Sequence, residues 1–217
     1  MKAIMISIKP EWVEKILNGK KTIEIRKSAP KNFEGWVYIY CTKGKPYLYE
    51  SEWNTSRCSQ PEKGIEYCKG TGQNCISTTI LHGTQWGNVL EKRTYKNGKV
   101  VARFYLKKVE NIYIRKHSYC CDEFYYCTNT LEEDEICKKS RLDNQQLQEY
   151  LGDSSGYAWH IDNLEIFDKP KELGEFNVPC PTEKCCKCRY AKFMYGQVAC
   201  NKPRLTKAPQ SWCYVEV

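Results

Sequence analysis

The sequence predicts an α+β fold, with several short strands and two or three helices, followed by a C-terminal cysteine-rich module. Three observations lead to this prediction. Residues 100–106 alternate apolar and polar side chains, which is typical of a half-buried strand. Residues 10–17 carry apolar side chains at helical spacing. The residues after Pro179 differ in composition from the rest of the chain and are rich in cysteine.

The N-terminal segment is expected to begin with a strand and a helix. Residues 1–8 are mostly apolar and predict the first strand. Pro10 suits the first turn of a helix, where a backbone N–H would have no partner in any case, and Gly19 provides a C-terminal stop. Residues 36–41 are rich in aromatic and β-branched side chains and predict a strand, in which Cys41 is expected to be a small buried residue.

The segment Thr22–Arg26 predicts a strand that carries charge on one face. Alternation places Ile23 and Ile25 on the face toward a core and Glu24 and Arg26 on the other. One interpretation is a solvent-exposed ion pair on an edge strand, which would contribute little energy.

The middle of the chain predicts an insertion and a hairpin. Residues 50–88 are polar and lack clear periodicity, so we expect an insertion between strands. Asn97-Gly98 favours a tight type I′ turn and predicts that residues 89–95 and 100–106 pair with each other. In the second of these strands, alternate residues are expected to face a core: Val100, Ala102, Phe104 and Leu106.

The following region combines a second cysteine-rich stretch with a helix and a strand. Residues 117–140 are acidic and contain cysteines, and no helix or strand is assigned to them. Asp143 and Gln146 have the spacing of a capping box at a helix start, and Gly152 is placed to end that helix. Residues 158–167 predict a last strand before a proline-marked linker.

Composition limits the class of protein. The chain has 217 residues and a net charge of +8, with 34 Lys+Arg against 26 Asp+Glu, which favours polyanionic partners. No stretch has the length of a membrane span, and the start lacks the pattern of a signal peptide. We therefore expect a cytoplasmic protein without a membrane partner, in which the 14 cysteines are thiols or metal ligands.

The C-terminal cysteines have the spacing of a structural zinc site. Cys185 and Cys188 form a knuckle, and Cys200 and Cys213 would complete a four-thiolate shell that leaves no position for water. Cys180 is the alternative to Cys213 if the latter is a core thiol. The bound Zn2+ would help to fold a tail with little apolar content.

Two domains follow from these patterns. Residues 1–170 are expected to form the strand-rich domain, with the insertion at 50–88, and residues 180–217 the zinc-binding tail. Within the insertion, three cysteines and a histidine are candidates for a second metal site, although their spacing matches no known pattern: Cys58, Cys68, Cys75 and His82.

Gly19, Lys21, Glu24 and Arg26 match a G-x-K-x-x-E-x-R signature, and the chain thereby resembles the ASCH domain family. The resemblance implies a PUA-like β-barrel and covers most of residues 1–170. The longer members of this kind, found in phages and prophages, carry a cysteine-rich tail like the one here.

Strict alternation would place Lys21 on the face opposite Glu24, but the junction with the preceding helix need not keep that alternation.

The resemblance implies binding of RNA or of a modified nucleobase in a cleft around residues 19–26. Lys21 and Arg26 would contact phosphate or a carbonyl edge, and Glu24 would accept hydrogen bonds or orient Arg26. His160 is included because the resemblance places its strand near the cleft. Lys43 is included because it lies on a loop beside tyrosines, a pattern that suits phosphate binding and base stacking. Single-stranded DNA is a further ligand class.

Two other functions compete with this interpretation. In the first, the protein is a hydrolase of a modified nucleoside or of RNA, with Lys21 and Glu24 as the catalytic groups. Small ASCH-like amidohydrolases that act on N4-acetylcytidine share the Gly-x-Lys-Thr-Ile-x-Ile-Arg pattern, but Glu24 stands where their threonine nucleophile would be. In the second, the zinc-ordered tail binds a protein partner.

Overall fold

A computed structural model of the protein describes residues 2–54, 90–116, 124–180, 190–194 and 197–217. The chain divides into two compact units, of which one comprises Met1–Lys45 and Gly98–Val217 and the other Pro46–Asn97. The described residues form a mixed α+β fold with three α-helices and curled sheets, as the sequence predicts.

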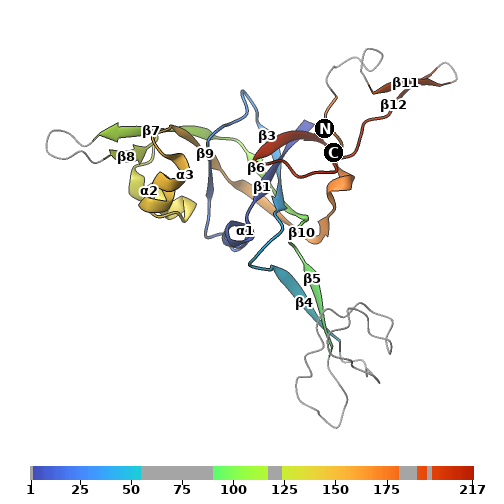
Figure 1. Cartoon of the computed structure of the whole chain (residues 1–217), viewed down its shortest axis with the longest axis horizontal. Helices are drawn as coiled ribbons and strands as arrows, with labels where there is room; N and C mark the ends of the chain where they lie inside the picture. Colours follow the sequence, from blue (N-terminus) through green and yellow to red (C-terminus); the bar gives the residue numbers. More distant parts are fainter. Residues whose placement is uncertain (1, 55–89, 117–123, 181–189, 195–196) are drawn as a thin grey trace, which may run out of the picture. The chain divides into compact units, whose positions relative to one another are not determined.

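The larger sheet belongs to the first unit and contains five strands in the order β10-β6-β3-β1-β13. β1 pairs in parallel with β3 and antiparallel with β13, so the two ends of the chain lie side by side (Figure 1). Its strands are β1 (Lys2–Ile8), β3 (Gly35–Cys41), β6 (Val100–Leu106), β10 (Asp162–Lys171) and β13 (Trp212–Glu216).

The second sheet of this unit contains four strands in the order β2-β9-β7-β8, and all of its pairs are antiparallel. β2 is first in this order and pairs only with β9, so it lies at the sheet edge. The strands are β2 (Ile23–Arg26), β7 (Val109–Lys116), β8 (Phe124–Cys127) and β9 (Gly156–His160).

Three helices and a short 3-10 turn accompany these sheets. α1 (Pro10–Leu17) connects β1 to β2 and buries Val13 and Ile16, as its apolar stripe predicts. α2 (Glu133–Ser140) ends at Arg141, and α3 (Asn144–Leu151) begins at the predicted capping box of Asp143 and Gln146. The 3-10 turn η1 covers Leu173–Glu175.

Two apolar clusters show which faces of the strands are buried. The helix-side cluster forms where α2 and α3 cover the four-stranded sheet: Ile23, Ile25, Ile112, Tyr126, Leu131, Ile136, Leu147, Leu151 and Ala158. The C-terminal cluster forms between the five-stranded sheet and the returning chain: Ala3, Met5, Tyr38, Tyr40, Val100, Phe176 and Val215. The predicted core face of β6 is fully buried, and so is Cys41.

Two hairpins complete the described structure. β4 (Tyr49–Asn54) pairs with β5 (Leu90–Tyr95) in the second unit, and residues 55–89, which hold most of the predicted insertion, lie outside the described residues. β11 (Ala191–Met194) pairs with β12 (Gln197–Cys200), so that Cys200 stands opposite Ala191.

Two predictions about individual elements were wrong, and one stretch without a predicted element contains a helix. The segment around Asn97-Gly98 does not join a hairpin, because β5 pairs with β4 whereas β6 pairs with β3 and β10. Residues 158–167 form parts of two strands in different sheets, since the chain leaves β9 after His160 and enters β10 at Asp162. The acidic stretch 117–140 contains α2, which the cysteine content of this stretch obscured.

The predicted domain boundaries at residues 170 and 180 stay a prediction. The structure adds that β13 is a strand of the five-stranded sheet, so the last residues of the predicted tail pair with the start of the chain. Among the residues that the structure describes, no helix is both long enough and apolar enough to cross a membrane.

Candidate functional site

A buried ion cluster connects β2 to its surroundings. The Lys21 ammonium lies 3.3 Å from Glu24 Oε2, and Arg26 Nη2 lies 3.1 Å from Glu24 Oε1. The side chain of Lys21 is 2% exposed, and those of Glu24 and Arg26 are each 9% exposed. The interpretation of Glu24 and Arg26 as a solvent-exposed ion pair is therefore wrong, although β2 is an edge strand.

Backbone carbonyls hold the two cations in place. Lys21 Nζ donates a hydrogen bond of 2.6 Å to the carbonyl of Ser140 at the end of α2. Arg26 Nη2 donates one of 2.6 Å to the carbonyl of Ser7 in β1, and Nη1 lies 3.4 Å from Ser211 Oγ. The cluster thus contacts both sheets, α2 and the segment before β13.

Local geometry explains why Lys21 reaches Glu24. Gly19 has a φ of +72°, a left-handed conformation that an L residue with a side chain adopts only with strain, and it turns the chain out of α1. Lys21 precedes the first strand residue, and its N–H donates to the carbonyl of Lys15. The alternation of β2 therefore does not apply to it, and the signature residues Gly19, Lys21, Glu24 and Arg26 act together.

The electrostatics of the cluster are asymmetric. Burial lowers the pKa of the Lys21 ammonium, while the Glu24 carboxylate opposes that shift. Two basic side chains share one carboxylate in a place with little water, so the cluster carries one more positive than negative charge when Lys21 is protonated. Such a site favours a negative or electron-rich ligand atom.

Two donors at this site have no hydrogen-bond partner among the described residues: Arg26 Nε and Trp159 Nε1. Trp159 stands directly opposite Glu24 in the β2–β9 pair and is fully buried. Sequence analysis did not select Trp159, nor the carbonyl partners Ser7 and Ser140, because no motif in the sequence indicates these contacts.

His160 does not join the cluster. It pairs with Ile23, whose side chain lies in the helix-side cluster, and so it faces the other side of the sheet from Glu24. Its Nε2 lies 2.6 Å from Glu110 Oε2. His160, which was expected at the cleft, thus belongs to a second polar group around Glu110.

Glu110 is the centre of this second group. Its Oε1 accepts hydrogen bonds from Thr128 and Thr130, and Lys108 Nζ lies 3.1 Å from its Oε2. Burial alone would raise the pKa of Glu110, but the hydrogen bonds from Thr130, Lys108 and His160 lower it to about 2. This carboxylate is saturated with donors, which suits a structural role.

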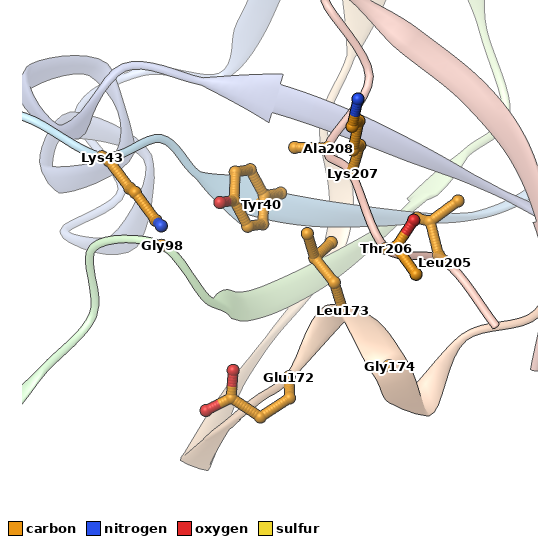
Figure 2. A pocket seen from close by; sticks show the side chains of 10 residues that line it. All are labelled: Tyr40, Lys43, Gly98, Glu172, Leu173, Gly174, Leu205, Thr206, Lys207 and Ala208. Carbon is orange, nitrogen blue, oxygen red and sulfur yellow. The ribbon is translucent and has the colours of Figure 1, made fainter.

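Lys43 lies in a third place. It follows β3 and lines a pocket with Tyr40, Leu173 and Leu205, none of which belongs to the ion cluster (Figure 2). The structure therefore brings together Lys21, Glu24 and Arg26 of the predicted ligand-binding residues and separates Lys43 and His160 from them.

The predicted zinc ligands are only partly described. Cys185 and Cys188 lie outside the described residues, and the backbone of Cys200 is placed in β12. Cys213 packs against the C-terminal cluster, and Cys180 is half-buried. Within the described part of the chain no cluster of metal-ligating side chains is found, and the second candidate site at Cys58, Cys68, Cys75 and His82 lies outside it.

Comparison with known proteins identifies one family. The sequence profile of the ASCH domain matches residues 6–133, more than half of the 217 residues. No curated protein matches the chain.

Crystal structures of an ASCH protein from Zymomonas mobilis are similar to this chain. The protein itself is 16% identical with a TM-score of 0.47, and the match covers 99% of this chain and 87% of that one. A serine-to-alanine variant is 13% identical with a TM-score of 0.43, and the match covers 99% and 88%.

The Glu110 group predicts acid sensitivity. Because the folded-state pKa is depressed, the stabilisation is present above the unfolded-state pKa of about 4.5 and is lost as the pH falls toward 2. Thermal unfolding should show that wild type loses more stability between pH 5 and pH 3 than Glu110→Gln, which cannot ionise. Equal losses in the two proteins would contradict the assignment.

Proposed function

The chain belongs to the ASCH domain family, and on that premise we propose that it binds RNA or a modified nucleobase at the Lys21–Glu24–Arg26 cluster. The ASCH domain is a PUA-like fold associated with RNA binding. Lys21 and Arg26 contact a phosphate or a base carbonyl, and Glu24 holds the two cations in position. Single-stranded DNA is a further ligand class for the same site.

One observation carries this proposal, namely that two buried basic side chains share the single carboxylate of Glu24. A buried carboxylate paired with one cation would be neutral, whereas here two cations approach a single carboxylate at 3.3 and 3.1 Å. Burying the second cation costs desolvation free energy, and its interactions inside the protein do not fully compensate for that cost. A phosphate or carbonyl oxygen would compensate for this cost, and the net charge of +8 supports an anionic partner.

The alternative function is a hydrolase of a modified nucleoside or of RNA. The lowered pKa of Lys21 supports it, since a desolvated amine loses its proton more easily and can act as a base. Glu24 would then orient Lys21 or exchange protons with it over 3.3 Å.

We propose in addition that the tail holds a structural Zn2+ with Cys185, Cys188 and Cys200. β12 supports this, because the pairing of Cys200 with Ala191 brings the backbone of Cys200 next to the strand that begins three residues after Cys188. We assign the fourth position to Cys180, because the Cys213 side chain packs against the C-terminal cluster. This tail is the feature shared with the long phage-type members, and its surface can hold a protein partner.

Binding is tested with two neighbouring lysines. Lys21→Met should weaken binding of a short single-stranded RNA roughly tenfold or more, because a charged hydrogen-bond donor is removed. Lys20→Met should change it by less than about twofold, because Lys20 is exposed. Calorimetric titration measures both, and thermal unfolding verifies that each variant is folded. Equal affinities of the two variants would contradict the proposal.

Catalysis is tested with Glu24→Gln, which keeps the shape of Glu24 and removes its charge. If the protein is a hydrolase, mass spectrometry of modified nucleosides incubated with wild type shows a product, and the variant forms it at least about a hundredfold more slowly. A product formed equally by both proteins would exclude Glu24 from the reaction.

Zinc is tested by the metal content of the purified protein. We expect one Zn2+ per chain in wild type, loss of the metal in Cys188→Ser and Cys180→Ser, and retention in Cys213→Ser. Loss in Cys213→Ser with retention in Cys180→Ser would move the fourth ligand to Cys213. Wild type without zinc would refute the site.

A further inference from the structure

Two buried N–H groups at the ion cluster are left without an acceptor in the part of the chain that the structure describes. Arg26 Nη1 and Nη2 have partners, but Nε has none, and the Trp159 indole N–H has none either. Arg26 is 8% exposed and Trp159 is fully buried. An unsatisfied buried donor is energetically costly and rare in proteins, so two at one place require an explanation.

The two donors belong to the same face of the β2–β9 pair. Glu24 pairs with Trp159 and Arg26 with Tyr157, so Arg26 is the diagonal neighbour of Trp159. Diagonal neighbours on one sheet face are separated by about 7–8 Å between their Cα atoms, which is within reach of long and aromatic side chains. Glu24 shares this face, with Arg26 two residues along the same strand and Trp159 directly opposite.

Neither donor finds an acceptor in the cluster itself. Each oxygen of Glu24 already faces a cation, Oε1 that of Arg26 and Oε2 that of Lys21. The neighbouring Trp212 provides a contrast, because its ring packs against Trp159 at 5.8 Å, yet its own indole N–H donates to Ser28 Oγ at 3.0 Å. The indole N–H of Trp212 thus has a partner, whereas the indole N–H of Trp159 and Arg26 Nε have none among the described residues.

We infer that Trp159 Nε1 and Arg26 Nε are specificity-determining donors that bind acceptor atoms of a carbonyl-bearing nucleobase. This inference rests on the proposed function and adds the class of ligand. The open positions of the site are donors only, so the ligand edge must present acceptors. A carbonyl oxygen has two lone pairs and accepts over a broad range of directions, whereas a ring nitrogen has one. Uracil, cytosine and guanine each carry a carbonyl and fit this pattern, and adenine, which has none, fits it poorly.

A partly exposed aromatic residue lies near the cluster. Tyr150 is 38% exposed, and burial raises the pKa of its hydroxyl, while the nearby Arg26 guanidinium opposes that shift. Trp212 is half-buried beside Trp159. The Tyr150 ring provides a planar surface for a base whose edge points to the two donors.

The experiment compares two tryptophans. Uridine, cytidine, adenosine and short single strands of each base are titrated into wild type, Trp159→Phe and Trp212→Phe. We expect Trp159→Phe to bind uridine or oligouridine roughly three- to tenfold more weakly, the effect of one hydrogen bond. Trp212→Phe should change affinity by less than about twofold, and the adenine ligands should bind wild type more weakly than the uracil ligands.

A second measurement uses wild type alone, because Trp159→Phe also removes buried ring volume. In nitrogen-15 spectra, the indole N–H resonance that is missing from Trp159→Phe should shift when the uracil ligand binds. An unmoved resonance, or equal affinities of Trp159→Phe and wild type, overturns this inference and leaves the proposed function standing. If wild type binds none of the ligands, the proposed function fails, and this inference fails with it.

Discussion

The ion cluster of Lys21, Glu24 and Arg26 is the constraint on which the arrangement of the first unit depends. β2 is a four-residue edge strand, yet its charged side chains contact the carbonyl of Ser7 in β1 and that of Ser140 in α2. Removal of Glu24 would leave two buried basic side chains without their carboxylate, which is far more costly than the net stabilisation that the intact cluster provides. The main effect of the cluster is therefore to fix the positions of the two sheets and α2 relative to β2. Its net contribution to stability is smaller.

The two faces of β2 differ in their side chains, one being apolar and the other charged. Ile23 and Ile25 enter the helix-side cluster with Leu147 and Leu151, so apolar burial anchors the strand. The other face is free to carry charged groups because that anchoring does not depend on them. Glu110 and His160 belong to the anchored side, where a carboxylate surrounded by four donors completes a structural network.

The cluster has the properties expected of a ligand site and few of those expected of a purely structural ion pair. A structural pair is balanced in charge and in hydrogen bonds, because imbalance in a dry environment is costly. Here one cation is in excess, and the donors of Arg26 and Trp159 lack partners among the described residues. Proteins keep such imbalances where another molecule compensates for them, which is why we propose the ligand site here and not at the saturated Glu110 group.

The sequence by itself determined the local elements: α1 with its stop at Gly19, the capping box of α3, the buried alternation of β6 and the family signature on β2. These depend on spacing, capping and backbone conformation within a few residues, which a sequence displays directly. It could not determine that β5 and β6 belong to different sheets, or that Lys43 and His160 lie away from the cluster. Only the tertiary structure decided these features. It also decided the carbonyl partner of Arg26 and the ring packing of Trp159, because such contacts join residues far apart in the chain and leave no local pattern.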